Sequence, residues 1–206
     1  MDIAVFGATG GTGQEVVRQA LAQGHNVTAF VRDPARMPII NDRLRLVVGD
    51  VLDPTRVDEA VAGQNAVVVS LGSQERSNRT LRSEGTANVI RSMEAHDVPR
   101  LVVVSAGGTG DSYEELPLAF KALVRTVLRN AYIDHEKQEE HVRASKLDWV
   151  IVRPAGLTND PSTGRYHNGP PQSAERGAQV SRADLADLVV QQLTDDRYLR
   201  KALSIP

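Results

Sequence analysis

A run of seven residues, Gly7-Ala8-Thr9-Gly10-Gly11-Thr12-Gly13, has the types and the spacing that could hold phosphate groups. Glycine tolerates the positive φ of an abrupt strand-to-helix turn and lets the backbone approach a pyrophosphate closely. The N-terminus of the helix that follows would add N–H groups and a partial positive charge. The G-x-x-G-x-x-G spacing predicts a dinucleotide site, and a tight turn without a ligand is the alternative. The expected contacts there are Gly7, Thr9, Gly10, Gly11, Thr12 and Gly13.

Arg32 stands directly after the second expected strand, where NAD-binding folds usually carry an acid for the ribose hydroxyls. A guanidinium at this position would pair with a 2′-phosphate, and Arg36 would add a contact or stack on the adenine. Asp33 comes one position late for the ribose, so it could instead cap the following turn. Unless both arginines are merely solvated, they favour NADP(H) over NAD(H).

Further cofactor contacts are expected where later strands end. Asp50 and Val51 follow the third strand, and Asp50 either hydrogen-bonds the adenine amino group or finishes the strand. Leu71 and Gly72 follow the fourth strand, where a glycine lets the backbone pass close to the cofactor ribose. Pro154, after the sixth strand, is included among the expected cofactor contacts.

Acid–base residues for reducing a ketone are poorly placed in this sequence. Hydride transfer to a planar acceptor mainly needs oriented stacking, whereas an alkoxide needs a proton donor, commonly Tyr-x-x-x-Lys on one helical stripe. Ile133 stands four residues before Lys137, and Tyr132 stands five before it. Lys137 either reaches the nicotinamide ribose or belongs to a solvated charged face. His135 either donates a proton near the site or is a surface histidine.

The elements that must position these residues alternate along the chain. Short, continuously apolar runs, typical of strands covered on both faces, occupy residues 3–6, 27–31, 44–48, 66–69, 101–104 and 149–152. Helical periodicity lies between them, with stop or start signals at Gly24, at Asp53-Pro54 and in a capping box beginning at Ser181. This β-α alternation predicts a Rossmann-type α/β fold, a doubly wound parallel sheet with helices on both faces. The irregular segment 158–179 is expected to be a loop over the site.

The bulk composition narrows the classes of function. A length of 206 residues predicts a single domain, 1–206. Lys+Arg total 24 against Asp+Glu 26, so no global basic field would attract nucleic acid or an anionic membrane. The chain has no cysteine, and its histidines lack metal-pair spacing, so we expect no metal. It shows neither a signal peptide nor a membrane-length apolar run, which favours a cytoplasmic protein. We expect a monomer or a weak homo-oligomer.

Motifs across nearly the whole chain stand in the same order as in one family: 7–13, Val31-Arg32-Asp33, Val48-Gly49-Asp50-Val51, Leu71-Gly72, Ser83-Glu84-Gly85, Val104-Ser105-Ala106, 160–164 and 181–185. The chain thus resembles the biliverdin-IXβ reductase/flavin reductase family of atypical short-chain dehydrogenase/reductases. The resemblance implies NADP binding and hydride transfer to flavins, some bilins and other planar acceptors. It implies that Ser105 lies beside the nicotinamide and the substrate.

Departures from the family pattern fall on the substrate side. Gly156 replaces a histidine that these reductases carry after the sixth strand, and Ala178 replaces an arginine. These changes argue against a bilin as the natural substrate. Arg76, Arg79 and Arg82 either attract an anionic substrate such as FMN or decorate a helix start, and Tyr166 either stacks on an acceptor or packs at the rim.

The sequence therefore predicts an NADPH-dependent reductase of a flavin, quinone, dye or bilin-like acceptor, with Ser105, Lys137 and His135 as candidate catalytic residues. A non-catalytic NADP(H) sensor that regulates a partner is the rival hypothesis. An epimerase or dehydratase that recycles its bound cofactor is a third.

Overall fold

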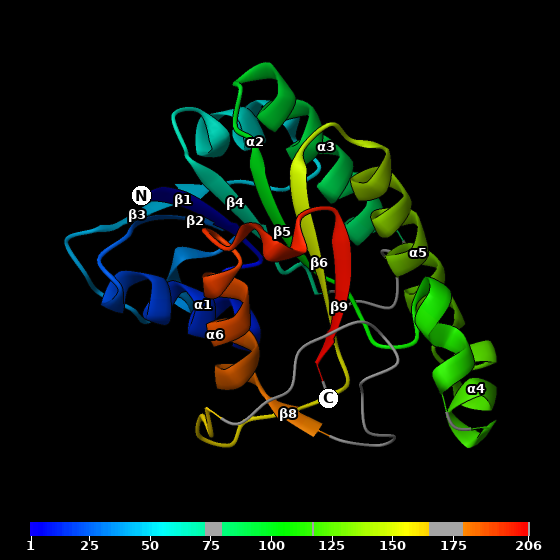
Figure 1. Ribbon diagram of the computed structural model, residues 1–206. Helices are drawn as coiled ribbons and strands as arrows, with labels where there is room; N and C mark the ends of the chain where they lie inside the picture. Colours follow the sequence, from blue (N-terminus) through cyan, green and yellow to red (C-terminus); the bar gives the residue numbers. More distant parts are fainter. Residues whose placement is uncertain (73–79, 117, 165–178, 206) are drawn as a thin grey trace.

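The computed structural model describes residues 1–72, 80–116, 118–164 and 179–205. Its main sheet is built from the strands β1 (Asp2–Phe6), β2 (Asn26–Val31), β3 (Leu44–Val48), β4 (Ala66–Val69), β5 (Arg100–Val104), β6 (Asp148–Pro154) and β9 (Lys201–Ile205). All of these strands are parallel, in the order β3-β2-β1-β4-β5-β6-β9 (Figure 1). A separate parallel pair joins β7 (Gly156–Thr158) to β8 (Gln179–Ser181).

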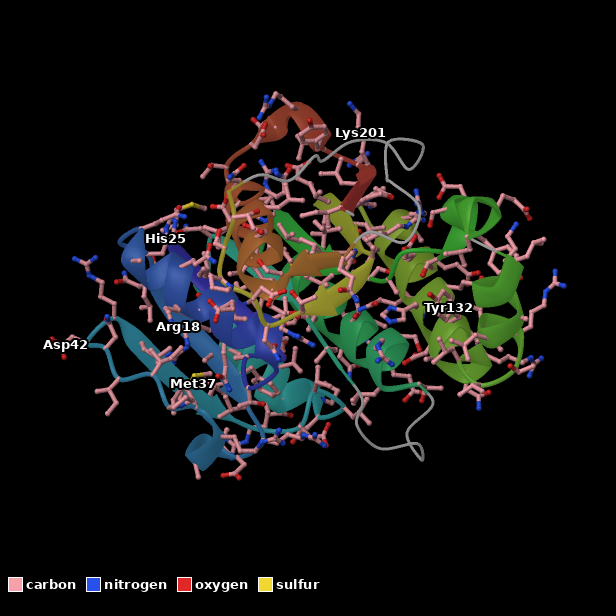
Figure 2. The ribbon with its side chains drawn as sticks, turned by 90° about the horizontal axis from the view of Figure 1, so that it is seen from below. Arg18, His25, Met37, Asp42, Tyr132 and Lys201 are labelled. Atoms are coloured by element: carbon pink, nitrogen blue, oxygen red, sulfur yellow. The ribbon has the colours of Figure 1, made fainter. Side chains whose placement is uncertain are left out.

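Helices cover both faces of this sheet. They are α1 (Gly11–Ala22), α2 (Pro54–Val61), α3 (Leu81–Ala95), α5 (Arg129–Ala144) and α6 (Arg182–Gln191). Helix α4 (Leu118–Arg125) packs on α5 instead. Helices α1 and α6 pack against each other on one face, and α2, α3 and α5 form the other layer (Figures 1 and 2). Short 3-10 turns occur at η1 (Pro34–Arg36), η2 (Gly110–Glu115) and η4 (Asp196–Tyr198).

The continuous apolar strands supply both cores. Side chains alternate along a strand, so Val5 of β1 joins the α1/α6 core whereas Phe6 joins the α2/α3/α5 core. Both side chains are fully buried. The predicted fold class, a Rossmann-type doubly wound sheet, is confirmed. Strand β9 was not predicted, because Lys201 and Ser204 interrupt its short apolar run.

Polar caps set the starts of several elements, as the sequence predicted. The Asp53 carboxylate accepts hydrogen bonds from the backbone N–H groups of the first turn of α2. The Ser181 hydroxyl accepts the Asp184 N–H at 3.0 Å and so caps α6. Asp33 caps η1 through the Ala35 N–H at 3.0 Å, which confirms the capping alternative for this acid.

The strand order places the site. Strands β1 and β4 are neighbours, yet the chain leaves β1 toward β2 on one side and continues from β4 toward β5 on the other. Ligands of open α/β sheets bind at such a reversal, beyond the carboxyl ends of the strands. The residues that follow β1, β2, β4, β5 and β6 therefore meet at one edge. Within the described chain, no helix has the length and apolar character to cross a membrane.

Candidate functional site

The glycine turn after β1 is shaped by close backbone contacts. Gly7 has a φ of +81°, and a Cβ on it would lie 2.1 Å from the Ser70 carbonyl oxygen of the neighbouring strand. A Cβ on Gly13 would lie 2.2 Å from the Gly7 oxygen. The Gly10 N–H closes the turn by donating to that same oxygen at 3.0 Å. Only glycine fits at positions 7 and 13, so the backbone itself forms the floor of the site.

The start of α1 is open toward solvent. Helix α1 has Gly10 as its N-cap and carries no side-chain cap, so its first N–H groups stay available to an anion. Arg182, the first residue of α6, crosses over this turn: a Cβ on Gly11 would lie 2.8 Å from the Arg182 Nε. The Arg182 Nη1 donates to the Asn159 side chain at 2.7 Å and to the Thr158 carbonyl at 3.2 Å. A cation held above a helix N-terminus suits a pyrophosphate.

A cleft of about 350 Å³ runs along the carboxyl edge above this turn. That volume is within the range of small-molecule sites. The predicted residues that line it are Gly7, Thr9, Gly10, Gly11, Thr12, Arg32, Arg36, Asp50, Val51, Leu71, Gly72, Ser105, His135 and Pro154. Gly13 lies beneath the turn rather than on the cleft surface. The structure thus brings most of the predicted site together.

The end of the cleft beyond β2 is cationic. Arg32 and Arg36 are both exposed and line the cleft, and neither forms an ion pair with another described residue. Asp50 is exposed and its Oδ1 accepts the Leu52 N–H at 2.9 Å, so this carboxylate shapes the turn after β3. The two guanidinium groups are available to an anion at this end.

Ser105 and His135 are buried at the other end of the cleft. Ser105 is 5% exposed, and its Oγ has no hydrogen-bond partner among the described residues. His135 on α5 is buried rather than a surface histidine, and its Nδ1 also lacks a partner within the described part of the chain. Burial, together with the charge of Arg82, lowers the pKa of His135 to about 4. The ring is therefore neutral at pH 7 and has no imidazolium proton to give.

Lys137 and Tyr132 are not brought to the cleft. Lys137 is exposed on α5 and is absent from the cleft lining, so the structure does not place it beside a nicotinamide ribose. Tyr132, labelled on α5 in Figure 2, donates its hydroxyl to the Gly107 carbonyl at 2.8 Å, and burial raises its pKa. Among the described lining residues there is no tyrosine and no lysine. The Tyr-x-x-x-Lys chemistry therefore has no counterpart there.

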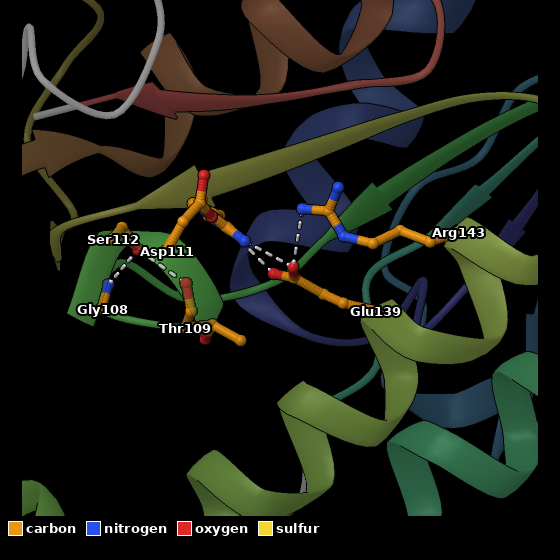
Figure 3. Close-up of polar contacts among 7 residues, drawn as sticks. Gly108, Thr109, Asp111, Ser112, Glu139 and Arg143 are labelled. Atoms are coloured by element: carbon orange, nitrogen blue, oxygen red, sulfur yellow. Dashed lines mark hydrogen bonds and ion pairs between the residues drawn. The ribbon is translucent and has the colours of Figure 1, made fainter.

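A buried ion cluster supports the wall of the cleft behind Pro154. Arg153 is fully buried and forms a bidentate pair with Glu139 of α5, at 2.6 and 2.9 Å, while its Nη1 contacts Asp111 at 2.5 Å. Figure 3 shows Glu139 between this arginine and Arg143, beside the loop in which Gly108 and Thr109 contact the Ser112 hydroxyl. The cluster ties α5 and η2 to the end of β6.

The segment before residue 165 is anchored by Asp184 of α6. Its carboxylate accepts hydrogen bonds from the Ser162 and Thr163 hydroxyls at 2.6 and 2.9 Å and from the Gly164 N–H at 3.0 Å. Although burial acts to raise the pKa of Asp184, these hydrogen bonds lower it. Arg76, Arg79, Tyr166 and Ala178 lie outside the described residues. Gly156 is described, in β7, where a Cβ would meet the Gln179 side chain at 3.3 Å.

Arg182 is the principal functional candidate that the sequence reasoning missed. It stands inside the capping box that starts at Ser181, and that motif explained it as part of a helix start. The available signal was a cation directly after the N-cap of a late helix. In the structure, this cation packs on the glycine turn. Phe30, Leu81 and Leu157 also line the cleft, as apolar walls that no motif marks. Over the described ranges, no group of three His, Asp or Glu side chains is arranged to hold a metal.

A parallel sheet whose order reverses beside a glycine turn, with a cleft at the reversal, defines a dinucleotide-binding Rossmann protein. Residues 7–196 match the NAD(P)H-binding family, and the chain belongs to that family. A 3-diazoavenalumate denitrifying reductase from a Streptomyces species is 38% identical over 194 residues, 82% of this chain and 60% of the reductase. An uncharacterised chloroplastic protein of Arabidopsis thaliana is 27% identical over 210 residues, 98% of this chain and 75% of that protein.

Solved structures of similar shape include oxidoreductases. A short-chain dehydrogenase/reductase of Veillonella parvula in complex with NADP has a TM-score of 0.83 and 22% identity, covering 99% of this chain and 93% of that one. ChuY, an anaerobilin reductase of Escherichia coli O157:H7, has a TM-score of 0.82 and 24% identity, covering 100% of this chain and 96% of that one. At these identities the likeness shows the fold.

Proposed function

We propose that the protein is an NADPH-dependent reductase of a flavin or a similar planar acceptor. The observation that carries this proposal is that the two ends of one cleft carry different side chains. Within the described chain, Arg32 and Arg36 leave two unpaired guanidinium groups at one end. At the opposite end, Ser105 lies with His135, Arg82 and apolar walls, and no tyrosine–lysine pair lines it among the described residues. The first end suits a 2′-phosphate, and the second suits an acceptor that needs no protein acid.

The chain fits a dinucleotide on its own geometry. Backbone N–H groups at the start of α1 and the Arg182 guanidinium would hold the pyrophosphate over the floor formed by Gly7 and Gly13. Leu71, with the other apolar walls, would exclude water from the reacting end. When bound, the nicotinamide supplies a hydride, and the acceptor takes its proton from solvent. His135 is neutral at pH 7, which agrees with a proton that comes from solvent and not from the protein.

Two similar proteins support reduction as the reaction class. The Streptomyces relative is a reductase, and ChuY is an anaerobilin reductase. Their particular substrates are properties of those proteins. For this chain we propose only the shared chemistry, hydride transfer from a nicotinamide to a conjugated acceptor.

The test is anaerobic NADPH oxidation, followed by absorbance, with FMN, riboflavin, a quinone, a dichlorophenol dye and biliverdin offered separately. The proposal expects turnover with at least one acceptor and faster turnover with NADPH than with NADH. If NADPH binds and no acceptor is reduced, the reductase proposal fails.

That negative result would favour the second candidate, a non-catalytic NADP(H) sensor. The absence of a tyrosine and a lysine from the described cleft lining is the observation that supports this alternative. The sensor hypothesis expects tight dinucleotide binding without consumption. An epimerase or dehydratase would need the same missing proton-transfer pair, so the geometry disfavours it.

A further inference from the structure

Arg82, at the start of α3, carries a cation into the cleft at the end where Ser105 and His135 lie. Its side chain lines the cleft and is 13% exposed. A guanidinium that is this deeply placed is normally paired and hydrogen-bonded, because an uncompensated charge away from water is costly. The partners of Arg82 therefore decide what this end of the cleft can bind.

Asp134 of α5 is the nearest anion, but it is largely engaged elsewhere. Its carboxylate accepts the backbone N–H groups of Arg82 and Ser83, each at 3.0 Å, and the Ser83 hydroxyl at 2.6 Å. The Arg82 Nη1 reaches it only at 3.5 Å, longer than a strong charge-assisted hydrogen bond. The Arg82 Nε is buried without a partner in the described chain. Asp134 thus caps α3 and leaves the guanidinium with unused donors.

Two further polar atoms on this wall also lack partners. The Ser105 Oγ and the His135 Nδ1 are buried and unpaired among the described residues, and both residues line the cleft with Arg82. Buried polar atoms are almost always hydrogen-bonded, so such a group points to a ligand. Among the described lining residues, Asp50 is the only acid. It follows β3, the edge strand, and three strands separate β3 from β5, which precedes Ser105. At the Ser105 end, the charged side chain of the described lining is therefore the Arg82 guanidinium, with the Asp134 carboxylate buried behind it.

Building on the proposed reductase function, we propose that Arg82 binds an anionic substituent of the electron acceptor, a carboxylate or a phosphate. The protein would then select planar acceptors that carry such a group over neutral ones. The planar guanidinium fork matches both oxyanions, so this wall predicts the charge of the substituent and not its chemical source. Arg32 and Arg36 would bind the cofactor and would not contact the acceptor.

Matched acceptor pairs test this proposal. FMN and riboflavin differ by a phosphate, and biliverdin and its dimethyl ester differ by two free carboxylates. With NADPH saturating, the wild-type kcat/KM should favour the anionic member of at least one pair by about tenfold or more, the effect of a charge-assisted contact. Arg82→Gln should abolish that preference by raising KM for the anionic member. The KM values for the neutral member and for NADPH should stay unchanged.

Two variants control for damage to α3. Ser83→Ala removes the hydroxyl contact to Asp134 but keeps the cation, so it should retain the preference. Arg82→Lys keeps the charge without the planar fork and should retain part of the preference, which leaves the proposal testable if Arg82→Gln does not fold. Quenching of flavin fluorescence by the NADP⁺-loaded protein measures the same preference as a Kd without turnover.

Three results would overturn the proposal. These are a wild type that prefers neither anionic member, an Arg82→Gln variant that weakens both members of a pair equally, and a variant that raises KM for NADPH instead. The failure of the reductase function would look different. In that case no acceptor is turned over, while the fluorescence titration still reports whether the anionic flavin binds through Arg82.

Discussion

Under the proposed function, individual side chains divide the cleft into a cofactor end and an acceptor end. Arg32 and Arg36 are exposed cations beyond β2, whereas Ser105, His135 and Arg82 are mostly buried around the other end. The first group was readable from the sequence because its position after a glycine turn and a second strand has a known geometric meaning. The burial of His135 was not, because a histidine within a charged helical stretch gives no sign of which face is covered.

Arg32→Ala should weaken NADPH binding far more than NADH binding. Losing a charge-assisted contact to the 2′-phosphate costs on the order of 1.5–3 kcal/mol, or about ten- to a hundredfold in Kd. Titration of each cofactor by fluorescence measures the difference. Arg18→Ala, which removes an exposed cation of α1 outside the cleft lining, is the matched control. Equal losses for both cofactors would refute the assignment of Arg32 to the phosphate.

His135 should make the protein less stable in mild acid. Burial, aided by Arg82, lowers its pKa from 6.5 to about 4, so between these values the unfolded chain binds the proton and the folded protein does not. The free energy of unfolding should therefore fall as the pH drops from about 6.5 to about 4, by up to roughly 3 kcal/mol. Urea unfolding of wild type and His135→Gln between pH 4 and 7 isolates this contribution from Asp134 and Glu139. If the unfolding free energies of wild type and His135→Gln changed in parallel with pH, the contribution of His135 would be contradicted.

Secondary-structure elements fix these side chains through a few points of close contact. The glycine turn joins β1 to α1 against β4, and the Arg153–Glu139 pair joins β6 to α5. The turn could be predicted, because glycine spacing records a backbone constraint locally. The ion pair could not, because its partners are separated by 14 residues and belong to different elements.

Gly7→Ala and Gly63→Ala should separate crowding from backbone strain. Both glycines have positive φ, +81° and +76°, but a Cβ on Gly63 meets nothing within 4 Å. Gly63→Ala should cost about 1–2 kcal/mol from the left-handed backbone alone. Gly7→Ala should cost roughly 1–3 kcal/mol more, because its Cβ would strike the Ser70 carbonyl. It should also weaken NADPH binding, as Gly63→Ala should not. Similar urea midpoints for the two variants would argue against a tight turn.

Breaking the buried ion pair should destabilise the protein strongly. Glu139→Gln leaves the Arg153 guanidinium fully buried and poorly compensated, at a cost of about 3–5 kcal/mol in unfolding free energy. The double variant Arg153→Met/Glu139→Leu removes both charges and should recover much of that loss. Denaturant unfolding of the single and double variants measures the coupling. A single variant that loses less than about 1 kcal/mol would show that the pair is not a strong link.

The molecule as a whole was largely predictable in its architecture. Strand-length apolar runs such as 66–69 and 101–104, alternating with capped helices, specified a doubly wound sheet, which in turn specified the edge where the site forms. Strand β9 and the pair β7–β8 were missed, since their short runs contain polar or glycine residues. Arg82, Ser105 and His135 were each named as candidates, but their meeting on one wall could not be predicted, because they come from three elements that only the tertiary fold brings together.

The proposed function requires hydride to pass from NADPH to an acceptor held in this cleft. Anaerobic mixing of the NADPH-loaded protein with excess acceptor, monitored at the absorbance of both partners, measures that transfer within a single turnover. We predict that NADPH is consumed one for one with acceptor reduction, and that Arg32→Ala slows the reaction at limiting NADPH. Persistent NADPH absorbance in the presence of bound cofactor and every acceptor would contradict the reductase assignment.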